Sequence, residues 1–199
     1  MNNPLTQRQS FIDWRNSQLT ISYFPPTWSD LDLEFDWKHT VQIDEVPRDD
    51  AWDSYTTEWK YQLEELHIGW GYSKEITTHY MSIRPELNEN LKSILSEFGD
   101  KTFSYNMLKL TPGHMLAWHF DSYATFINKN PIPQNKSDSI KRTAVLLTEW
   151  NFGHVIQIGE RVLASWKRGE AYTWLGDTWH GACNFGNTDM IVMQVTYVE

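Results

Sequence analysis

The sequence predicts an α+β domain with a double-sheet jelly-roll core. Two observations favour this class: residues 101–199 read as a series of short strands separated by turns, and a clear helical pattern precedes them. Aromatic residues make up 15% of the chain, which favours a compact globular protein with a well-filled interior. At 199 residues the chain is long enough to bury the core of one such domain. We therefore expect a single domain, in which residues 1–100 supply N-terminal helices packed on the sheet together with accessory strands.

The charge and the apolar pattern exclude several classes of partner. A net charge of -9 argues against a nucleic-acid backbone or an anionic membrane as the main partner. No apolar run approaches 18 residues, and the polar start of the chain lacks the apolar stretch of a signal peptide. Cys183 is the only cysteine, so no intrachain disulfide is possible, and we expect a reducing, cytoplasmic location. The oligomeric state is left open.

The first hundred residues contain weak strand signals and two helical patterns. Residues 19–24 and 41–43 have the apolar character of short edge strands. Apolar residues recur at helical spacing over residues 57–67, where we expect a first helix. A clearer apolar stripe predicts a helix over residues 85–98, beginning at Pro85 and ended by Gly99. The simplest interpretation of this stripe is a helix that packs on the sheet.

After Asp100 the pattern changes to strands, and their number and spacing are typical of a jelly roll or cupin-like barrel. A long segment, residues 122–141, interrupts them; it is rich in Asn, Lys, Ser and Pro. We expect it to form a surface loop, with a possible role as a lid. The expected strands are residues 103–111, 115–121, 142–149, 154–158, 161–165, 170–175, 179–184 and 190–198.

His119 and Asp121 form the pattern with the most chemical content. Residues two apart on a strand point to the same face, so this imidazole and carboxylate can reach one metal ion, with His180 as the third ligand. Two histidines and one carboxylate on one face of an octahedral metal leave three positions open, which suits Fe(II) enzymes that activate O2. His114 lies an odd number of residues from His119 and is expected to be structural, as is His154.

The surroundings of this triplet resemble a known superfamily. Leu108–Gly113 followed by His119–Asp121 is similar to the entry of the double-stranded β-helix in 2-oxoglutarate/Fe(II)-dependent oxygenases of the prolyl 4-hydroxylase-like group, where a Gly also lies six residues before the motif. Arg142–Leu147 resembles the third core strand of that group. Trp166–Glu170 and Trp179–Asn184 are more similar to the aspartyl/asparaginyl β-hydroxylase branch. The resemblance covers about half of the chain.

This resemblance implies a function. His119, Asp121 and His180 would bind Fe(II), which 2-oxoglutarate would chelate, and O2 would take the remaining position. A substrate C–H bond would be hydroxylated with release of succinate and CO2. The leading substrate class is a Pro, Asp or Asn side chain of a peptide or protein. The alternatives are an oxygenase of the same superfamily acting on small molecules or free amino acids, and a non-catalytic cupin-like protein that binds a metal or ligand.

One position departs from both branches. Ten residues after the distal histidine they usually place an Arg or Lys for the distal carboxylate of 2-oxoglutarate, whereas this chain has Met190. Because a buried carboxylate needs a charged partner or several hydrogen bonds, we expect Arg142 to replace the missing cation, with Lys109 as the second candidate. Tyr105 could add a hydroxyl group. Asn184 either caps a turn or binds the cosubstrate, and we favour the turn.

Other residues near these motifs have simpler interpretations. Cys183 is close to His180 in sequence but is flanked by Ala182 and Asn184, so we expect a small buried residue and not a thiolate ligand. Four aromatic side chains flank the motifs, and we expect most of them to be core or pocket lining. They are Trp118, Tyr123, Trp174 and Trp179.

Overall fold

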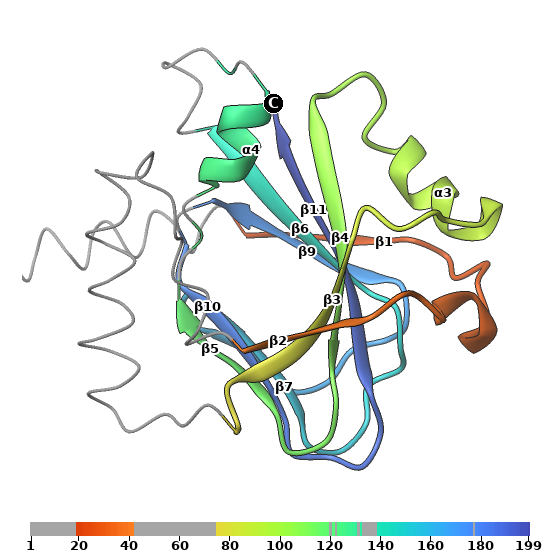
Figure 1. The fold of residues 1–199 in the computed structure, drawn as a ribbon, viewed down its shortest axis with the longest axis vertical. Coiled ribbons are helices and arrows are strands. Elements are labelled where there is room, and N and C mark those ends of the chain that lie inside the picture. The colour runs from red at the N-terminus through yellow and green to blue at the C-terminus, as the bar shows by residue number, and fades with distance from the viewer. Residues whose placement is uncertain are drawn as a thin grey trace, which may run out of the picture.

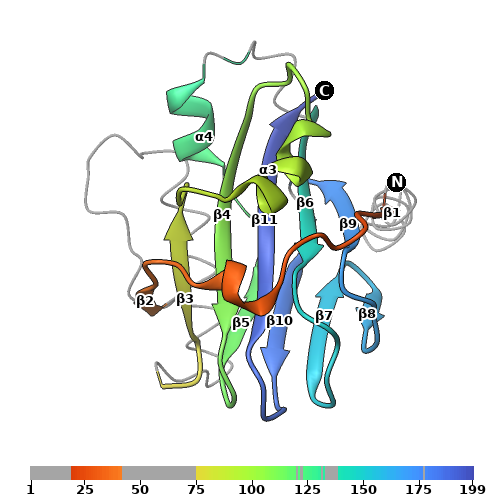
Figure 2. The same cartoon turned by 90° about the vertical axis from the view of Figure 1, so that its right-hand side faces the viewer.

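The computed structural model describes residues 19–41, 75–119, 121, 123–130, 132, 139–176 and 178–199. Two antiparallel sheets face each other (Figures 1 and 2). The large sheet has the order β1-β9-β6-β11-β4-β3-β2, and the small sheet has the order β5-β10-β7-β8. The strands are β1 (Thr20–Tyr23), β2 (Lys38–Val41), β3 (Thr78–Ile83), β4 (Phe103–Leu110), β5 (Met115–His119), β6 (Ile140–Leu146), β7 (His154–Ile158), β8 (Arg161–Leu163), β9 (Glu170–Leu175), β10 (His180–Asn184) and β11 (Met190–Val198).

The order of the strands confirms the predicted jelly roll. From β4 onward the chain alternates between the sheets: β4, β6, β9 and β11 pair in the large sheet, whereas β5, β7, β8 and β10 form the small one. This arrangement is a double-stranded β-helix. Its β4–β11 and β6–β11 pairs continue in register over most of the length of these strands, so the large sheet gives the small one a continuous surface to pack against.

Two apolar clusters lie on opposite faces of the large sheet. Alternation along β4 sends Leu108 and Leu110 into the space between the sheets and Met107 to the outer face. The inner cluster joins both sheets through residues such as Ile156 and Trp174. The outer cluster is covered by α3 and by the chain around the short 3-10 helix η1 (Asp30–Leu33), which lie across the front of the sheet in Figure 2.

Helix α3 (Glu89–Ser96) shows that the predicted helix over residues 85–98 was right in kind but began too early. The first helical residue is not Pro85, because Asn88 caps the helix by accepting a hydrogen bond from the Leu91 backbone N–H at 3.1 Å. Leu91 and Ile94 are buried in the outer cluster. The apolar stripe therefore faces the sheet, as expected.

Several elements differ from the expectation. β1 confirms the strand predicted at residues 19–24. β2 includes Val41, the first residue of the strand predicted at 41–43, and the rest of that strand lies outside the described residues, as does the helix expected at residues 57–67. β3 was not predicted. The loop predicted at residues 122–141 contains α4 (Ala124–Lys129), and β6 begins at Ile140. The polar composition concealed α4, which buries Phe126 through tertiary contacts.

Among the described helices, none has the length and apolar character needed to cross a membrane.

The packing of α3 on the sheet gives a stability prediction. Leu91 is fully buried, so Leu91→Ala should lower the free energy of unfolding by about 2–5 kcal/mol, as large-to-small core changes do. The adjacent Lys92 is half-exposed, and Lys92→Ala should change it by less than about 0.5 kcal/mol. Urea denaturation measures both values. Equal effects of the two substitutions would contradict the packing of α3.

Candidate metal centre

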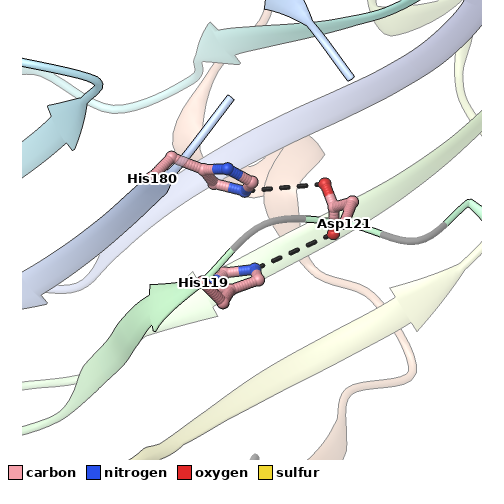
Figure 3. A group of neighbouring side chains, drawn as sticks. All are labelled: His119, Asp121 and His180. Carbon is pink, nitrogen blue, oxygen red and sulfur yellow. Dashed lines mark ion pairs between the residues drawn. The ribbon is translucent and has the colours of Figure 1, made fainter. Parts of the chain in front are cut away.

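His119 and His180 face each other across two neighbouring strands of the small sheet. His119 ends β5 and His180 begins β10, and the two residues are direct partners in the register of this strand pair. Direct partners project to the same face, so the two rings lie with their centroids 4.4 Å apart. Asp121 follows β5 and turns its carboxylate toward both rings (Figure 3). Its Oδ1 lies 3.8 Å from His119 Nε2 and its Oδ2 lies 3.5 Å from His180 Nε2.

Both imidazoles present an unprotonated Nε2 to this space. His119 Nδ1 lies 2.7 Å from the Ala117 carbonyl oxygen, and His180 Nδ1 lies 2.9 Å from that of Thr178. A carbonyl oxygen only accepts hydrogen bonds, so each Nδ1 carries the proton and each Nε2 keeps its lone pair. His180 Nε2 is buried and has no hydrogen-bond partner. A histidine that ligates a metal is usually held in this way through its other nitrogen.

The carboxylate of Asp121 is held by Arg142 and Tyr123. Arg142 Nη2 lies 2.9 Å from Asp121 Oδ2, and the Tyr123 hydroxyl donates to the same oxygen at 3.0 Å. Arg142 Nε donates to the Tyr123 hydroxyl at 3.3 Å, and Arg142 Nη1 donates to Gln194 Oε1 at 2.9 Å. The guanidinium also lies 5.1 Å from the centre of the Tyr123 ring. These groups form a hydrogen-bonded network behind the carboxylate.

The electrostatics of the site favour neutral histidines and an ionised aspartate. Burial lowers the pKa of His119 to about 3, and the nearby His180 adds to this effect. Burial likewise lowers the pKa of His180. For Asp121 burial alone would raise the pKa, but the positive charge of Arg142, together with the neighbouring imidazoles and the hydrogen bond from Tyr123, outweighs it and lowers the pKa to about 2. At neutral pH the site therefore offers two neutral imidazoles and one carboxylate.

These three residues fit a divalent transition metal. One ligand atom from each of them lies within 4.8 Å of the other two. Ligand atoms about 2.0–2.2 Å from one metal ion lie roughly 3 Å apart at right angles, so small side-chain adjustments bring the three onto one ion. The buried, unpartnered Nε2 of His180 would gain a partner. Imidazole and carboxylate donors suit Fe(II), and the arrangement leaves open positions.

The structure places the other candidate residues differently. Arg142 contacts the triad, whereas Tyr105 and Lys109 lie on the outer face of β4. There the Tyr105 hydroxyl donates to the Pro85 carbonyl at 2.8 Å, and the Lys109 ammonium lies over the rings of Trp37 and Tyr80. Asn106, Leu108 and Leu110 have the inner positions of this strand. Tyr105 and Lys109 therefore do not reach the space around the triad.

Asn184 ends β10 of the small sheet and Met190 begins β11 of the large sheet, and both have structural positions. The Asn184 amide donates to the carbonyls of Leu110 and Thr188 at 2.8 Å each, and its Oδ1 accepts from the Gly186 backbone N–H. This is the turn role that the sequence favoured. Met190 is 1% exposed and belongs to the inner apolar cluster, so its position provides no cation.

His114 and His154 are structural, as expected, whereas Tyr123 and Gln194 have roles at the site that were not predicted from the sequence. His114 hydrogen-bonds to Thr111, and His154 Nε2 lies 2.9 Å from the Thr188 carbonyl, so both have structural partners. Tyr123 was expected only as core or pocket lining, and Gln194 was not singled out at all. The sequence signal for Gln194 was available, because it is the one amide in the apolar strand 190–198.

Comparison with known proteins finds fold neighbours only. No protein-family model and no curated protein matches the sequence. Solved structures that are similar include a predicted oxalate decarboxylase from Thermotoga maritima (15% identity, TM-score 0.39, 61% of this chain and 82% of that one). They also include a cupin domain from Bordetella pertussis (14%, 0.37, 61% and 94%) and an oxidoreductase of the 2OG-Fe(II) oxygenase family from Burkholderia pseudomallei (15%, 0.39, 60% and 68%). At these TM-scores the similarity does not support an argument about activity.

The lowered histidine pKa values predict how the stability of the metal-free protein depends on pH. His119 takes up a proton near pH 6.5 when unfolded but only near pH 3 when folded. The unfolded state therefore binds more protons between these values, and the free energy of unfolding must fall as the pH falls below 6.5. For His119 alone the loss at pH 5 is about 2 kcal/mol.

Urea unfolding at pH 7 and pH 5 measures this loss, and a His119→Asn variant should show a smaller one. Buried His79, whose pKa is lowered to about 4, contributes with the same sign in both proteins. Equal stability of the unsubstituted protein at the two pH values would contradict the burial of neutral imidazoles.

Proposed function

We propose that this protein is an Fe(II)- and 2-oxoglutarate-dependent oxygenase that hydroxylates a C–H bond. The observation that carries the proposal is the convergence of His119 Nε2, His180 Nε2 and the Asp121 carboxylate from one side, with both Nδ1 atoms held by backbone carbonyls. When bound, the metal, 2-oxoglutarate and O2 supply the oxidation, and succinate and CO2 are released. The protein supplies the geometry, the charge balance and the exclusion of water.

Arg142 is the residue that we assign to the distal carboxylate of 2-oxoglutarate. A guanidinium has five N–H donors, and Arg142 uses three of them on Asp121, Tyr123 and Gln194. Two donors remain for a carboxylate. Trp174 is the direct partner of Arg142 in the register of β6 and β9, and its indole Nε1 is buried without a hydrogen-bond partner. This N–H can donate to an acceptor near the guanidinium, which supports an anionic ligand there.

The buried surroundings of the triad suit a reaction that must exclude water. The ring of Trp174 lies 5.1 Å from that of His180 and shields one side of the site. Trp174 belongs to the inner apolar cluster, which joins the two sheets through Leu116, Ile158 and Val192. A low local polarity strengthens the attraction between Arg142 and a ligand carboxylate. The rigid strands that hold both histidines keep the ligand atoms in place during turnover.

The resemblance favours a Pro, Asp or Asn side chain in a peptide or protein as the substrate. Succinate formation should therefore increase when candidate peptides are added. Stimulation by free amino acids but not by peptides would favour a small-molecule oxygenase instead. Binding of metal without succinate formation under any condition would favour a non-catalytic cupin-like protein.

The metal and cosubstrate are tested together by anaerobic titration. Adding 2-oxoglutarate to the Fe(II)-loaded protein should produce a weak visible charge-transfer band, because its 2-oxo group and the metal come into contact. His119→Ala should abolish this band and reduce succinate formation to background. His114→Ala changes a histidine that is bonded to Thr111 and lies away from the triad, so this control should keep both signals. Absence of the band from the unsubstituted protein would contradict the proposed function.

The role of Arg142 is tested by comparing two 2-oxo acids. Pyruvate lacks the distal carboxylate, so the unsubstituted protein should prefer 2-oxoglutarate, whereas Arg142→Gln should lose most of this preference. A hydrogen bond to a charged group contributes about 1.5–3 kcal/mol, which corresponds to a loss of roughly 10- to 100-fold in the affinity ratio. Titration at saturating Fe(II) separates this ratio from effects on metal binding. An unchanged ratio would assign the distal carboxylate to another residue.

A further inference from the structure

We infer that Tyr123, Arg142 and Gly176 form a clamp that makes Asp121 bind the metal through one oxygen only, Oδ1. The inference rests on the metal centre of the proposed function and adds residues that position its carboxylate ligand. Tyr123 and Arg142 do so by direct contact with Asp121, and Gly176 does so through Tyr123. None of the three is itself a ligand of the proposed metal.

The lone pairs of the Asp121 carboxylate are divided unevenly between its two oxygens. An ionised carboxylate has about four acceptor sites, two on each oxygen. Asp121 Oδ2 accepts from the Tyr123 hydroxyl at 3.0 Å and is paired with Arg142 Nη2 at 2.9 Å. Both sites of Oδ2 are therefore in use. Oδ1 keeps its two sites and lies 3.8 Å from His119 Nε2, whereas Oδ2, which lies 3.5 Å from His180 Nε2, is already occupied by its two donors.

Tyr123 is held in position by its backbone conformation and by the contacts of its side chain. It has a left-handed backbone conformation with φ 54°, which is uncommon for a bulky residue and is kept only when its surroundings enforce it. Its hydroxyl is tied to Asp121 and Arg142, and the guanidinium lies 5.1 Å from the centre of its ring. These contacts fix the position of the hydroxyl.

Gly176 provides the space that the Tyr123 ring fills. A Cβ atom at residue 176 would lie 2.6 Å from Tyr123 Cε2 and 3.1 Å from Cδ2. Contacts this short would force the ring to move. Gly176 has no left-handed backbone requirement, so its role here is to leave room for the ring. The clamp therefore depends on a residue that does not touch Asp121.

The consequence for the metal is the number of open positions. With Asp121 bound through one oxygen, the triad uses three of six positions and leaves three. If both oxygens bound, only two would remain. A bidentate 2-oxo acid together with O2 needs three. The clamp thus preserves the position that distinguishes an oxygen-activating centre from a saturated metal site.

Titration with Co(II), in the absence of 2-oxoglutarate, tests the clamp through binding affinity and the visible spectrum of the bound ion. Tyr123→Phe removes one donor from Oδ2 and should weaken Co(II) binding by about 10-fold, the lower end of the effect of losing a partner of a metal ligand. It should also change the Co(II) spectrum, because the second carboxylate oxygen becomes able to bind. Gly176→Ala should cause the same changes by displacing the ring.

Two controls make the result specific. Tyr105→Phe also removes a hydroxyl that donates a hydrogen bond, but on the outer face of β4, and should leave Co(II) affinity and spectrum unchanged. The Tyr123→Phe/Gly176→Ala double variant should bind Co(II) about as well as Tyr123→Phe alone, because both substitutions remove the same contact.

The outcomes separate this inference from the proposed function. Unsubstituted protein that binds Co(II), together with a Tyr123→Phe variant of unchanged affinity and spectrum, would overturn the clamp and leave the metal centre standing. Unsubstituted protein that does not bind Co(II) would overturn both. If Gly176→Ala does not fold, Tyr123→Phe decides the question by itself.

Discussion

The pairing of β5 with β10 is the constraint on which the site depends. Because side chains alternate along a strand, a shift of one residue in this register would send His119 or His180 to the opposite face. Gly181 follows His180 at a point where the strands approach closely, and a Cβ there would lie 3.1 Å from the Leu116 carbonyl. A register irregularity between His180 and Ala182 accompanies this approach. Local backbone geometry therefore fixes where the second imidazole points.

The second constraint is charge balance in a buried place. A buried carboxylate without a partner would cost several kcal/mol or become protonated. Arg142 prevents both for Asp121 and is itself held by Tyr123 and Gln194. A metal ion would add two positive charges beside this cation, which the neutral imidazoles do nothing to offset. An anionic ligand near Arg142 would restore the balance, so charge as well as geometry favours a site that takes up metal and carboxylate together.

The sequence predicted the core of the fold better than its connections. Strand signals from residue 103 onward were strong. In the strands of the large sheet both faces are apolar, and this feature hid which face each residue uses. Lys109 and Tyr105 were proposed for the site although they share the outer face with Met107. Alternate residues of β4 point to opposite faces. The outer positions of Tyr105 and Lys109 therefore follow only once Leu108 and Leu110 are known to face the small sheet. The triad was accessible from spacing, whereas Tyr123 and Gly176 meet only through the fold.

Arg142 would serve two carboxylates at once if it binds both Asp121 and the cosubstrate, as we propose. The same guanidinium that orients Asp121 is the cation that we assign to the cosubstrate, so a shift of Arg142 toward a bound carboxylate would loosen one ligand of the metal. Tyr123 reduces this coupling, because its hydroxyl holds Asp121 Oδ2 through a hydrogen bond of its own. Gln194 fixes a third edge of the guanidinium. If Arg142 binds the cosubstrate as we propose, the bond from Tyr123 would keep the Asp121 carboxylate in place while the same guanidinium contacts the second carboxylate.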